Sequence, residues 1–301
     1  MMSIPRLVEL AWVRLNTHRE RTYEIGGKRI TLPRGHRLDW FRTIHPRYNE
    51  PVALICGLAR QKYGRLLSID VGANVGGTAA LAAQDSNFSI LCVEGNPFYF
   101  SFLQRNVAKF CPTAEFEKCF VGATDGELHG EVKRTVGTAS IIVGSPGARG
   151  TIELVSFDSL LARHPRFSEA RFLKIDTDGF DPNILLSAMR FLSDQHPLVY
   201  FEMDPCQAQS PRETWRRILD GLQQIGYDRF NVFDNFGAHL VQLGSDQIGL
   251  FDQLFDYVLA NRGLEKPAIY YFDVCAISAK DHDISDAIRS AAASPSFGTR
   301  P

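Results

Sequence analysis

The sequence predicts an α/β fold in which a mostly parallel sheet is covered by helices on both faces. Two observations carry this prediction. From residue 66 onward, short apolar strand-like runs alternate with glycine turns and helical apolar spacing. The first such run, "LLSIDV", passes directly into "GANVGG" and then into a small-residue helix pattern. Alternation of this kind is typical of parallel strands joined by crossover helices.

The first half of the predicted sheet follows in order. The expected strands cover residues 66–71, 89–95 and 115–123, and the helices between them cover 77–84 and 97–110. The alternation then breaks. Residues 122–160 contain short strand-like runs with glycine turns, which predict an insertion of β-hairpins and not a separate domain.

The second half resumes the pattern. Strands are expected at 171–179 and 197–203, helices at 182–193 and 211–226, and the last two strands, antiparallel, at 227–235 and 270–278. An N-terminal extension, residues 1–65, reads as a helix, a hairpin with its turn at Gly26-Gly27, and a helical stretch at 51–62. The main domain is then 66–280, and the Pro- and Ser-containing tail 281–301 is predicted to be disordered.

Composition limits the partners. A formal net charge of -1 argues against nucleic-acid binding, which usually needs a basic face. No apolar run approaches the roughly 20 residues that span a bilayer, and the N-terminus lacks a signal-peptide pattern. Six scattered cysteines without zinc spacing favour a reduced, cytoplasmic protein. The N-terminal segment is a candidate contact for a homodimer.

The glycine turn predicts a nucleotide site. Asp70, Gly72, Asn74 and Gly76 follow a buried strand and precede a helix, where glycine lets the backbone approach a ligand closely. Glu94 ends the next strand, 22 residues after Gly72, where a carboxylate can accept both ribose hydroxyls. Together these features are typical of adenosine-containing ligands.

NAD and S-adenosylmethionine (SAM) both use this architecture. An NAD site places a pyrophosphate at the helix N-terminus and uses a GxGxxG turn. The turn "DVGANVG" lacks the second glycine of that pattern and has an acid ahead of its first glycine. Asp70 can help to hold the ammonium group of SAM there, so the turn favours SAM.

Five ordered stretches, "IDVGANVG", "VEGNP", "FDSLL", "KIDTDGFDPNILLSA" and "VYFEM", resemble the FkbM-type family of SAM-dependent methyltransferases. The resemblance spans roughly residues 25–280. It implies the Rossmann-like class I methyltransferase fold, a seven-stranded sheet whose last strand is antiparallel. It also implies methyl transfer to hydroxyls, mostly of sugars, polyketides and related products.

The resemblance also assigns site residues. Gly72, Asn74 and Gly76 would line the SAM turn, Glu94 would bind the ribose, and Asn96 would lie beside the adenosine. The family commonly has a Glu where this chain has Asp178, which is one methylene shorter.

"KIDTDGFD" places Asp176, Asp178 and Asp181 at the carboxyl end of a predicted parallel strand, the edge where such folds bind ligands. Clustered carboxylates raise one another's pKa values, as a general base for a hydroxyl acceptor requires. Asp176 capping the following turn is the structural alternative. A second alternative is a metal site formed by Asp176, Asp178 and Glu202 together. The stretch "DTDGFD" itself does not fit the pattern of a calcium-binding loop.

Other candidates surround this edge. Glu202 ends the next strand and is expected to face the same cleft, and Lys174 is expected to pair with a neighbouring acid. His45 in "TIHPRYN" is the histidine expected to act as an acceptor-site base or lid contact, ahead of His239. Thr138 and Ser140 in "GTASI" are possible hydrogen-bond donors, although turn chemistry explains them equally well.

The expected function is SAM-dependent O-methylation of a sugar or glycosylated intermediate, with no metal among the site residues. An NAD(P)-dependent oxidoreductase is the alternative enzyme, but the chain lacks GxGxxG and a Tyr-xxx-Lys pair. A catalytically inactive nucleoside-binding module is the alternative outside enzymes.

Overall fold

The computed structural model of the chain describes residues 19–134, 137–143, 150–206, 212–262, 264 and 269–293. The helix expected at the extreme N-terminus falls on residues 1–18, outside the described residues, and so do residues 294–301 of the expected tail.

The largest sheet has eight strands in the order β13-β12-β14-β11-β10-β3-β4-β5. Five neighbouring strands, β11 to β5, run parallel, and β14 is antiparallel to both of its neighbours. The strands are β3 (Leu66–Val71), β4 (Phe88–Val93), β5 (Glu115–Glu117), β10 (Phe172–Ile175), β11 (Leu198–Met203), β12 (Tyr227–Asp234), β13 (His239–Gly244) and β14 (Phe272–Ser278). The predicted fold class is confirmed.

One strand more than the predicted seven is present. β13 adds to β12 as an antiparallel edge strand. The tight turn between them is held by Asp234, whose Oδ1 accepts hydrogen bonds from the backbone N–H groups of Phe236 (2.9 Å) and Ala238 (2.8 Å). This strand was absent from the predicted sheet; a side chain that satisfies two turn amides makes the hairpin.

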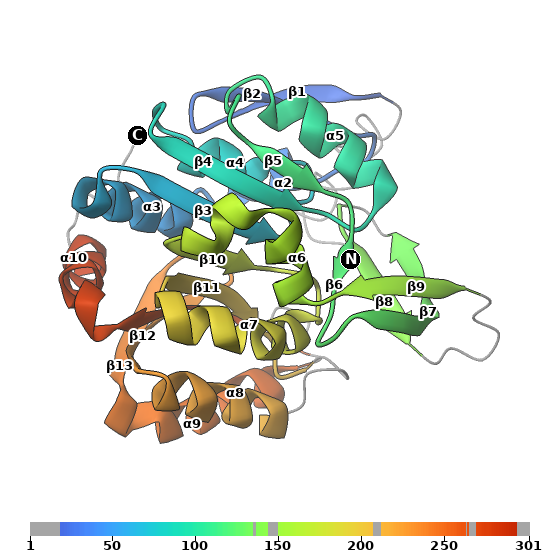
Figure 1. Cartoon of the computed structure of the whole chain (residues 1–301). Coiled ribbons are helices and arrows are strands. Elements are labelled where there is room, and N and C mark those ends of the chain that lie inside the picture. The colour runs from blue at the N-terminus through green and yellow to red at the C-terminus, as the bar shows by residue number, and fades with distance from the viewer. Residues whose placement is uncertain are drawn as a thin grey trace, which may run out of the picture.

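Helices cover both faces of the large sheet (Figure 1). Side chains alternate along each strand, so Ile69 and Val71 pack with one set of helices while Leu66 packs with the other. The first set is α6 (Phe157–Arg163), α7 (Asp181–Gln195), α8 (Arg212–Gln224) and α9 (Phe251–Asn261). The second set is α3 (Glu50–Tyr63), α4 (Gly77–Ala82), α5 (Pro97–Val107) and α10 (His282–Ala293). Short 3₁₀ turns complete the chain at η1 (Pro165–Glu169), η2 (Ser245–Leu250) and η3 (Ala279–Asp281).

The predicted hairpin insertion forms a second sheet of four strands, in the order β6-β9-β7-β8, which projects from one side of the molecule in Figure 1. Its strands are β6 (Phe120–Val121), β7 (Gly126–Arg134), β8 (Ala139–Val143) and β9 (Thr151–Val155). The single strand expected at 115–123 is therefore wrong: β5 pairs with β4 in the large sheet, whereas β6 pairs with β9 in the second.

The N-terminal extension packs onto the core. Its hairpin pairs β1 (Arg21–Ile25) with β2 (Lys28–Leu32), and the turn glycines Gly26 and Gly27 have φ values of +57° and +71°. A short helix, α2 (Leu38–Ile44), follows. Asn106 on α5 fastens the hairpin, because its side chain bonds both backbone groups of Thr31 (2.8 and 2.9 Å) and the carbonyl of Val75 (2.9 Å).

The chain after residue 281 differs from our expectation of a disordered tail. Residues His282–Ala293 form α10, with Ile284, Ser285 and Ile288 buried against the sheet. Apolar residues four apart supply the buried stripe that a helix needs, and this spacing outweighs the small-residue composition that suggested disorder.

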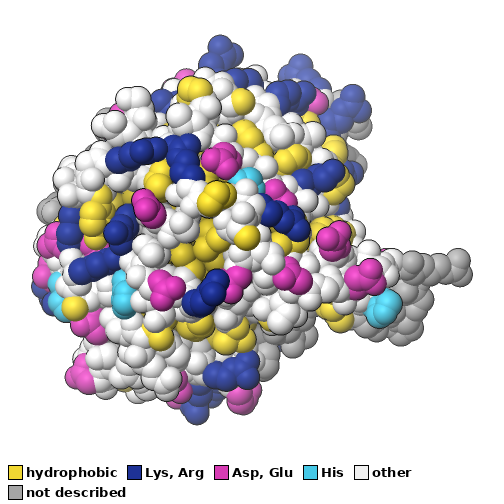
Figure 2. Space-filling model, viewed as in Figure 1, with side chains coloured by type: hydrophobic (Ala, Val, Ile, Leu, Met, Phe, Trp, Pro, Cys, Tyr) yellow, Lys and Arg dark blue, Asp and Glu magenta, His cyan; other side chains and the backbone are white. Residues whose placement is uncertain are grey.

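Every helix in the described part of the chain is too short or too polar to cross a membrane. On the face shown in Figure 2, lysine and arginine side chains are interspersed with aspartate and glutamate.

Asn106→Ala is expected to lower the free energy of unfolding by about 2–3 kcal/mol, because it leaves buried backbone groups without partners. Denaturant unfolding measures this. The matched control is Asn261→Ala, which removes one exposed bond to the carbonyl of Tyr257 at a helix end. If Asn106→Ala lowers the free energy of unfolding no more than Asn261→Ala does, the anchoring role of Asn106 is contradicted.

Candidate active site

A cavity of about 520 Å³ opens at the carboxyl ends of β3, β4, β10 and β11. Val71, Val93, Asp176 and Glu202, at or just beyond the ends of these strands, all line it. This size and position are typical of small-molecule sites in open α/β sheets.

Gly72 begins the turn at one end of the cavity. Its φ is +87°, and a Cβ added there would lie 1.8 Å from the carbonyl oxygen of Asp176. The chain after β10 therefore passes directly against this turn, as the hydrogen bond from Asp176 N to Val71 O (3.0 Å) also requires. Only glycine fits, so the turn and the "KIDTDG" edge form one structural unit.

Glu94 closes the turn from the neighbouring strand. Its Oε2 accepts a hydrogen bond from the backbone N–H of Asn74 (2.9 Å), and its Oε1 accepts one from the N–H of Asn96 (2.7 Å). Burial raises the pKa of this carboxyl to about 7, against the opposing effect of the two amides. Each oxygen keeps a further acceptor position, and Glu94 lines the cavity, so it can still receive ribose hydroxyls.

An apolar slot adjoins Glu94. Gly95, Phe120, Val121 and Ile141 line it, and a Cβ at Gly95 would lie 2.3 Å from the Phe120 ring. Phe120 and Val121 come from β6 and Ile141 from β8, so the hairpin insertion supplies one wall. Apolar side chains of this kind beside Glu94 suit a flat purine base.

Three predicted cofactor residues lie outside the cavity lining. Gly76 sits at the start of α4, where a Cβ would meet Val107 at 2.6 Å, so this glycine serves helix packing. The Asn96 side chain caps α5, accepting hydrogen bonds from two backbone N–H groups of its first turn. Asp70 is 1% exposed and faces Lys174 beneath the turn. The expected direct contacts of these three with SAM are therefore not supported by their positions.

Lys174 links the two halves of the site. Its Nζ lies 2.8 Å from Asp176 Oδ2 and 3.6 Å from Asp70 Oδ1, and the side chain is 2% exposed. The expected ion pair with a neighbouring acid is confirmed. These opposite charges raise the pKa of Lys174 in spite of its burial, so it stays a cation.

More carboxyl groups gather at the "KIDTDG" edge than Lys174 can neutralise. Burial first, and then the charge of Asp176, raises the pKa of Asp178 to about 7 and the pKa of Glu202 well above its ordinary value. Asp178 and Glu202 both line the cavity. Neither side-chain carboxyl group has a hydrogen-bond partner within the described residues. Asp181 turns away and accepts hydrogen bonds from the N–H (3.2 Å) and hydroxyl (2.8 Å) of Thr177.

The far end of the cavity is lined by aromatic and amide side chains that sequence reasoning missed. They come from three segments distant in sequence: Phe41, Tyr48 and Asn49; Asn235; and Tyr270 and Tyr271. Asn235 orients the last segment by accepting a hydrogen bond from Tyr270 N (3.0 Å). The aromatic and polar run "FRTIHPRYNEP" was the signal available for the first segment.

Tyr48 stands close to the carboxyl groups. Burial, followed by the charges of Asp176 and Asp273, raises the pKa of its hydroxyl. The hydroxyl therefore stays protonated and has no hydrogen-bond partner within the described residues. Its ring packs edge-on against Phe41, with centroids 4.7 Å apart.

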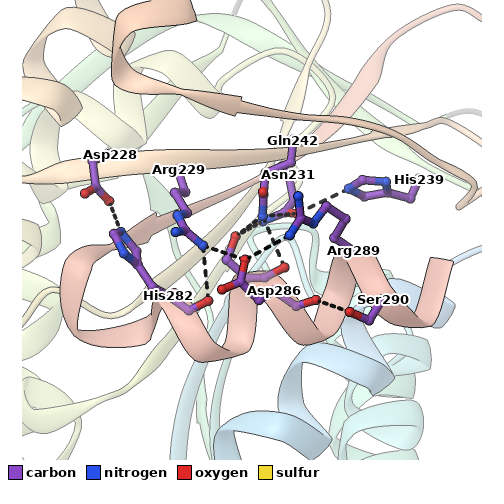
Figure 3. A network of polar contacts seen from close by, with 10 residues as sticks. Asp228, Arg229, Asn231, His239, Gln242, His282, Asp286, Arg289 and Ser290 are labelled. Atoms are coloured by element: carbon purple, nitrogen blue, oxygen red, sulfur yellow. Dashed lines mark hydrogen bonds and ion pairs between the residues drawn. The ribbon is translucent and has the colours of Figure 1, made fainter. Parts of the chain in front are cut away.

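The two predicted histidines lie elsewhere. His45 stacks on Phe236 (centroids 4.1 Å apart) and does not line the cavity, so its role as an acceptor-site base is not supported by its position. The His239 ring is directed at Asn231 on β12, with its Nε2 3.2 Å from Asn231 Oδ1 (Figure 3). In the "GTASI" segment, Thr138 lines the cavity but Ser140 does not.

No group of three or more His, Cys, Asp or Glu side chains in the described residues is arranged to hold a metal ion. The joint metal site considered for Asp176, Asp178 and Glu202 is therefore not supported by the geometry.

Residues 70–229 match the family model of the methyltransferase FkbM domain, which is more than half of the chain. The chain belongs to the FkbM methyltransferase family. The matched range starts at the glycine turn and ends within β12, so it contains Glu94, Asp176 and Glu202. The match shows a methyltransferase domain in the chain, and the cofactor of such a domain is SAM.

Similar solved structures are distant. The FkbM methyltransferase from Methylobacillus flagellatus is 15% identical, with a TM-score of 0.41 and coverage of 56% of this chain and 40% of that chain. The Bacillus cereus O-methyltransferase, solved with S-adenosylhomocysteine (SAH), is 10% identical, with a TM-score of 0.40 and coverage of 75% and 80%. The chain thus spans less than half of the first protein's length. No curated protein matches this chain. The family assignment rests on the family model alone.

The residues that line the cavity of this FkbM methyltransferase are themselves suited to SAM. The glycine turn leaves room for backbone approach, Glu94 offers acceptor positions beside an apolar slot, and uncompensated carboxyls suit a cation. When bound, SAM supplies a methyl group on a positively charged sulfur.

Gly72→Ala is expected to destabilise the protein by more than 2 kcal/mol and to abolish SAH binding, because the added Cβ displaces the backbone of Asp176. Gly64→Ala is the matched control: φ is +73° there, but no atom lies within 4 Å of the added Cβ. It should cost only the roughly 1–2 kcal/mol of left-handed backbone strain. Denaturant unfolding and calorimetry with SAH measure both effects, and equal losses in the two variants would refute the close-approach argument.

Glu94→Gln is expected to weaken SAH binding about tenfold at pH 8, since a carboxylate accepts ribose hydroxyls more strongly than an amide. In the wild type, Glu94 ionises as pH rises through about 7, so affinity should increase up to about tenfold from pH 6 to 8. Calorimetry across this range measures both. A variant with the same pH dependence as the wild type would exclude Glu94 as its source.

Proposed function

We propose that the protein transfers the methyl group of SAM to a hydroxyl of a sugar or of a glycosylated intermediate. The observation that carries this proposal is the composition of the far end of the cavity. There Tyr48 supplies a protonated hydroxyl close enough to feel the charges of Asp176 and Glu202, and Phe41 and Tyr271 line the same cavity. Aromatic rings can pack against the apolar face of a sugar ring, and carboxyl and hydroxyl groups can form hydrogen bonds with its hydroxyl groups.

An oxygen nucleophile suits the Tyr48 hydroxyl and the Glu202 carboxyl group. An acceptor hydroxyl can donate its proton to a carboxylate, present one lone pair to the methyl group, and receive a hydrogen bond on its other lone pair. A neutral amine has a single lone pair, so a donor at the position of Tyr48 would compete with its attack. The Tyr48 hydroxyl therefore favours hydroxyl acceptors over amines.

Glu202 is the proposed proton acceptor. Its raised pKa makes it a stronger base than an ordinary carboxylate, and it has no competing hydrogen bond within the described residues. Asp176 is held by Lys174 at 2.8 Å, which suits it to orient the acceptor and not to take its proton. Asp178 lies close enough to Glu94 to feel its charge, nearer the cofactor, where a carboxyl can face the sulfonium. The chain's contribution is then alignment, water exclusion and one proton transfer.

Glu202→Gln is expected to lower the methyl-transfer rate at least about 100-fold while SAH affinity stays within about twofold of the wild type. The assay measures release of SAH from SAM with a panel of free sugars, simple glycosides and nucleotide-linked sugars, and with a matched panel of amines. Glu213→Gln, on the exposed side of α8, is the control. Transfer only to amines would contradict the proposed function, and an unchanged rate would remove Glu202 from the base role.

A further inference from the structure

His36 touches the cofactor turn from outside the family-matched part of the chain. It lies between β2 and α2, is 6% exposed, and lines the same cavity as Gly72 and Glu94. Its ring Nε2 is 3.2 Å from Oδ1 of Asn74 in the glycine turn. Sequence reasoning did not single out this histidine.

The Asn74 side chain is held from two sides. Its Nδ2 donates a hydrogen bond to the carbonyl of Gly137 (2.9 Å), which lies two residues before β8 of the hairpin insertion. Its Oδ1 must then be the group that faces His36. One amide thus joins the N-terminal segment and the hairpin insertion, the two additions to the core, across the turn.

The neighbours of His36 determine which ring nitrogen carries the proton. Nδ1 accepts a hydrogen bond from the backbone N–H of Leu38 (3.3 Å), so Nδ1 is unprotonated and Nε2–H donates to Asn74. The charged groups nearest the ring are Asp39 on α2 and Arg21 on β1, and the Tyr99 ring of α5 packs edge-on at 5.9 Å. Burial lowers the pKa of His36, which keeps this neutral form at neutral pH.

The position of Asn74 in turn determines the position of Glu94. The backbone N–H of Asn74 donates to Glu94 Oε2 at 2.9 Å, and Asn74 itself has a left-handed φ of 50°, which a non-glycine residue adopts only when its surroundings hold it. A chain of two hydrogen bonds therefore runs from His36 through Asn74 to the carboxyl group of Glu94.

We propose that His36 is a positioning residue of the cofactor site: its hydrogen bond to Asn74, together with the bond from Asn74 to Gly137, holds Glu94 in the geometry that binds SAM. His36 acts through Asn74 and takes no part in the methyl transfer itself. The affinity for the cofactor then depends on a residue that lies more than 30 positions before the start of the family-matched range.

Calorimetry with SAH on the full-length protein at neutral pH tests this role. His36→Ala should weaken SAH binding about five- to tenfold, the effect expected for one lost buried hydrogen bond. His36→Gln should restore the affinity to within about threefold of the wild type, because the glutamine Nε2 can donate from nearly the same position as the histidine Nε2. The thermal midpoint of each variant without SAH is measured in parallel.

His239→Ala is the matched control, since His239 makes a contact of the same kind and length, 3.2 Å, to Asn231 Oδ1 (Figure 3), and neither residue lines the cavity. This variant should bind SAH like the wild type even if its thermal midpoint falls.

Two results would overturn the proposal: wild-type SAH affinity in His36→Ala, or equal weakening in His36→Ala and His36→Gln, which would assign the effect to core packing. Absence of SAH binding in the wild type would overturn the cofactor assignment as well. The choice of acceptor does not enter this measurement, so a failure of the proposed O-methylation leaves its result intact.

Discussion

The buried ion pair of Lys174 with Asp176 and Asp70 is the interaction on which the site depends. Lys174 lies on β10 directly beside Asp70 on β3, so the central strands of the sheet carry opposite charges in register. Removing one partner would leave an uncompensated buried charge, which is far more costly than losing a surface pair. The pair also fixes Asp176 where its backbone contacts Gly72, and in this way couples the cofactor turn to the acceptor edge.

One cation cannot neutralise the remaining carboxyl groups of the cavity. Asp178 and Glu202 in the cavity, and the buried Asp273 outside its lining, keep raised pKa values because they are buried and lie close to Asp176. A bound cation lowers such pKa values again, so a cationic cofactor favours the ionised carboxylates that can accept a proton. The same burial thus serves cofactor binding and proton transfer.

The core fold supplies the strand ends, and segments outside it complete the cavity. The N-terminal segment brings His36 to the cofactor turn and Tyr48 to the acceptor end, while the hairpin insertion brings Phe120 to the base slot. The fold therefore explains where the site lies, and these additions explain its shape.

Much of this could be predicted from the sequence. The order of strands and helices followed from local periodicity, and Glu94 and Glu202 were found because residues at the carboxyl ends of parallel strands must converge. The surroundings of other candidate residues depend on tertiary packing. The sequence does not reveal that Gly76 makes room for Val107, that Asn96 caps its own helix, or that the His45 ring stacks on Phe236.

Residues brought in from distant segments were the hardest to find. Asn235 and Tyr271 carry no local motif. They meet Tyr48 because the β12–β13 turn packs against the N-terminal segment, where a Cβ on Gly237 would lie 2.1 Å from the carbonyl of Arg47. The hairpin β13 was missed for a related reason, since a single side chain, Asp234, makes its turn.

The crystal structure of the SAH complex tests the central claim most directly, namely that one cavity holds the cofactor at the glycine turn and the acceptor at the β10–β11 edge. The account predicts the ribose hydroxyls within hydrogen-bond distance of Glu94, the adenine in the slot beside Phe120, and the sulfur directed toward Glu202 and Tyr48. SAH bound with its ribose away from Glu94, or with its sulfur directed away from the β10–β11 edge, would contradict it.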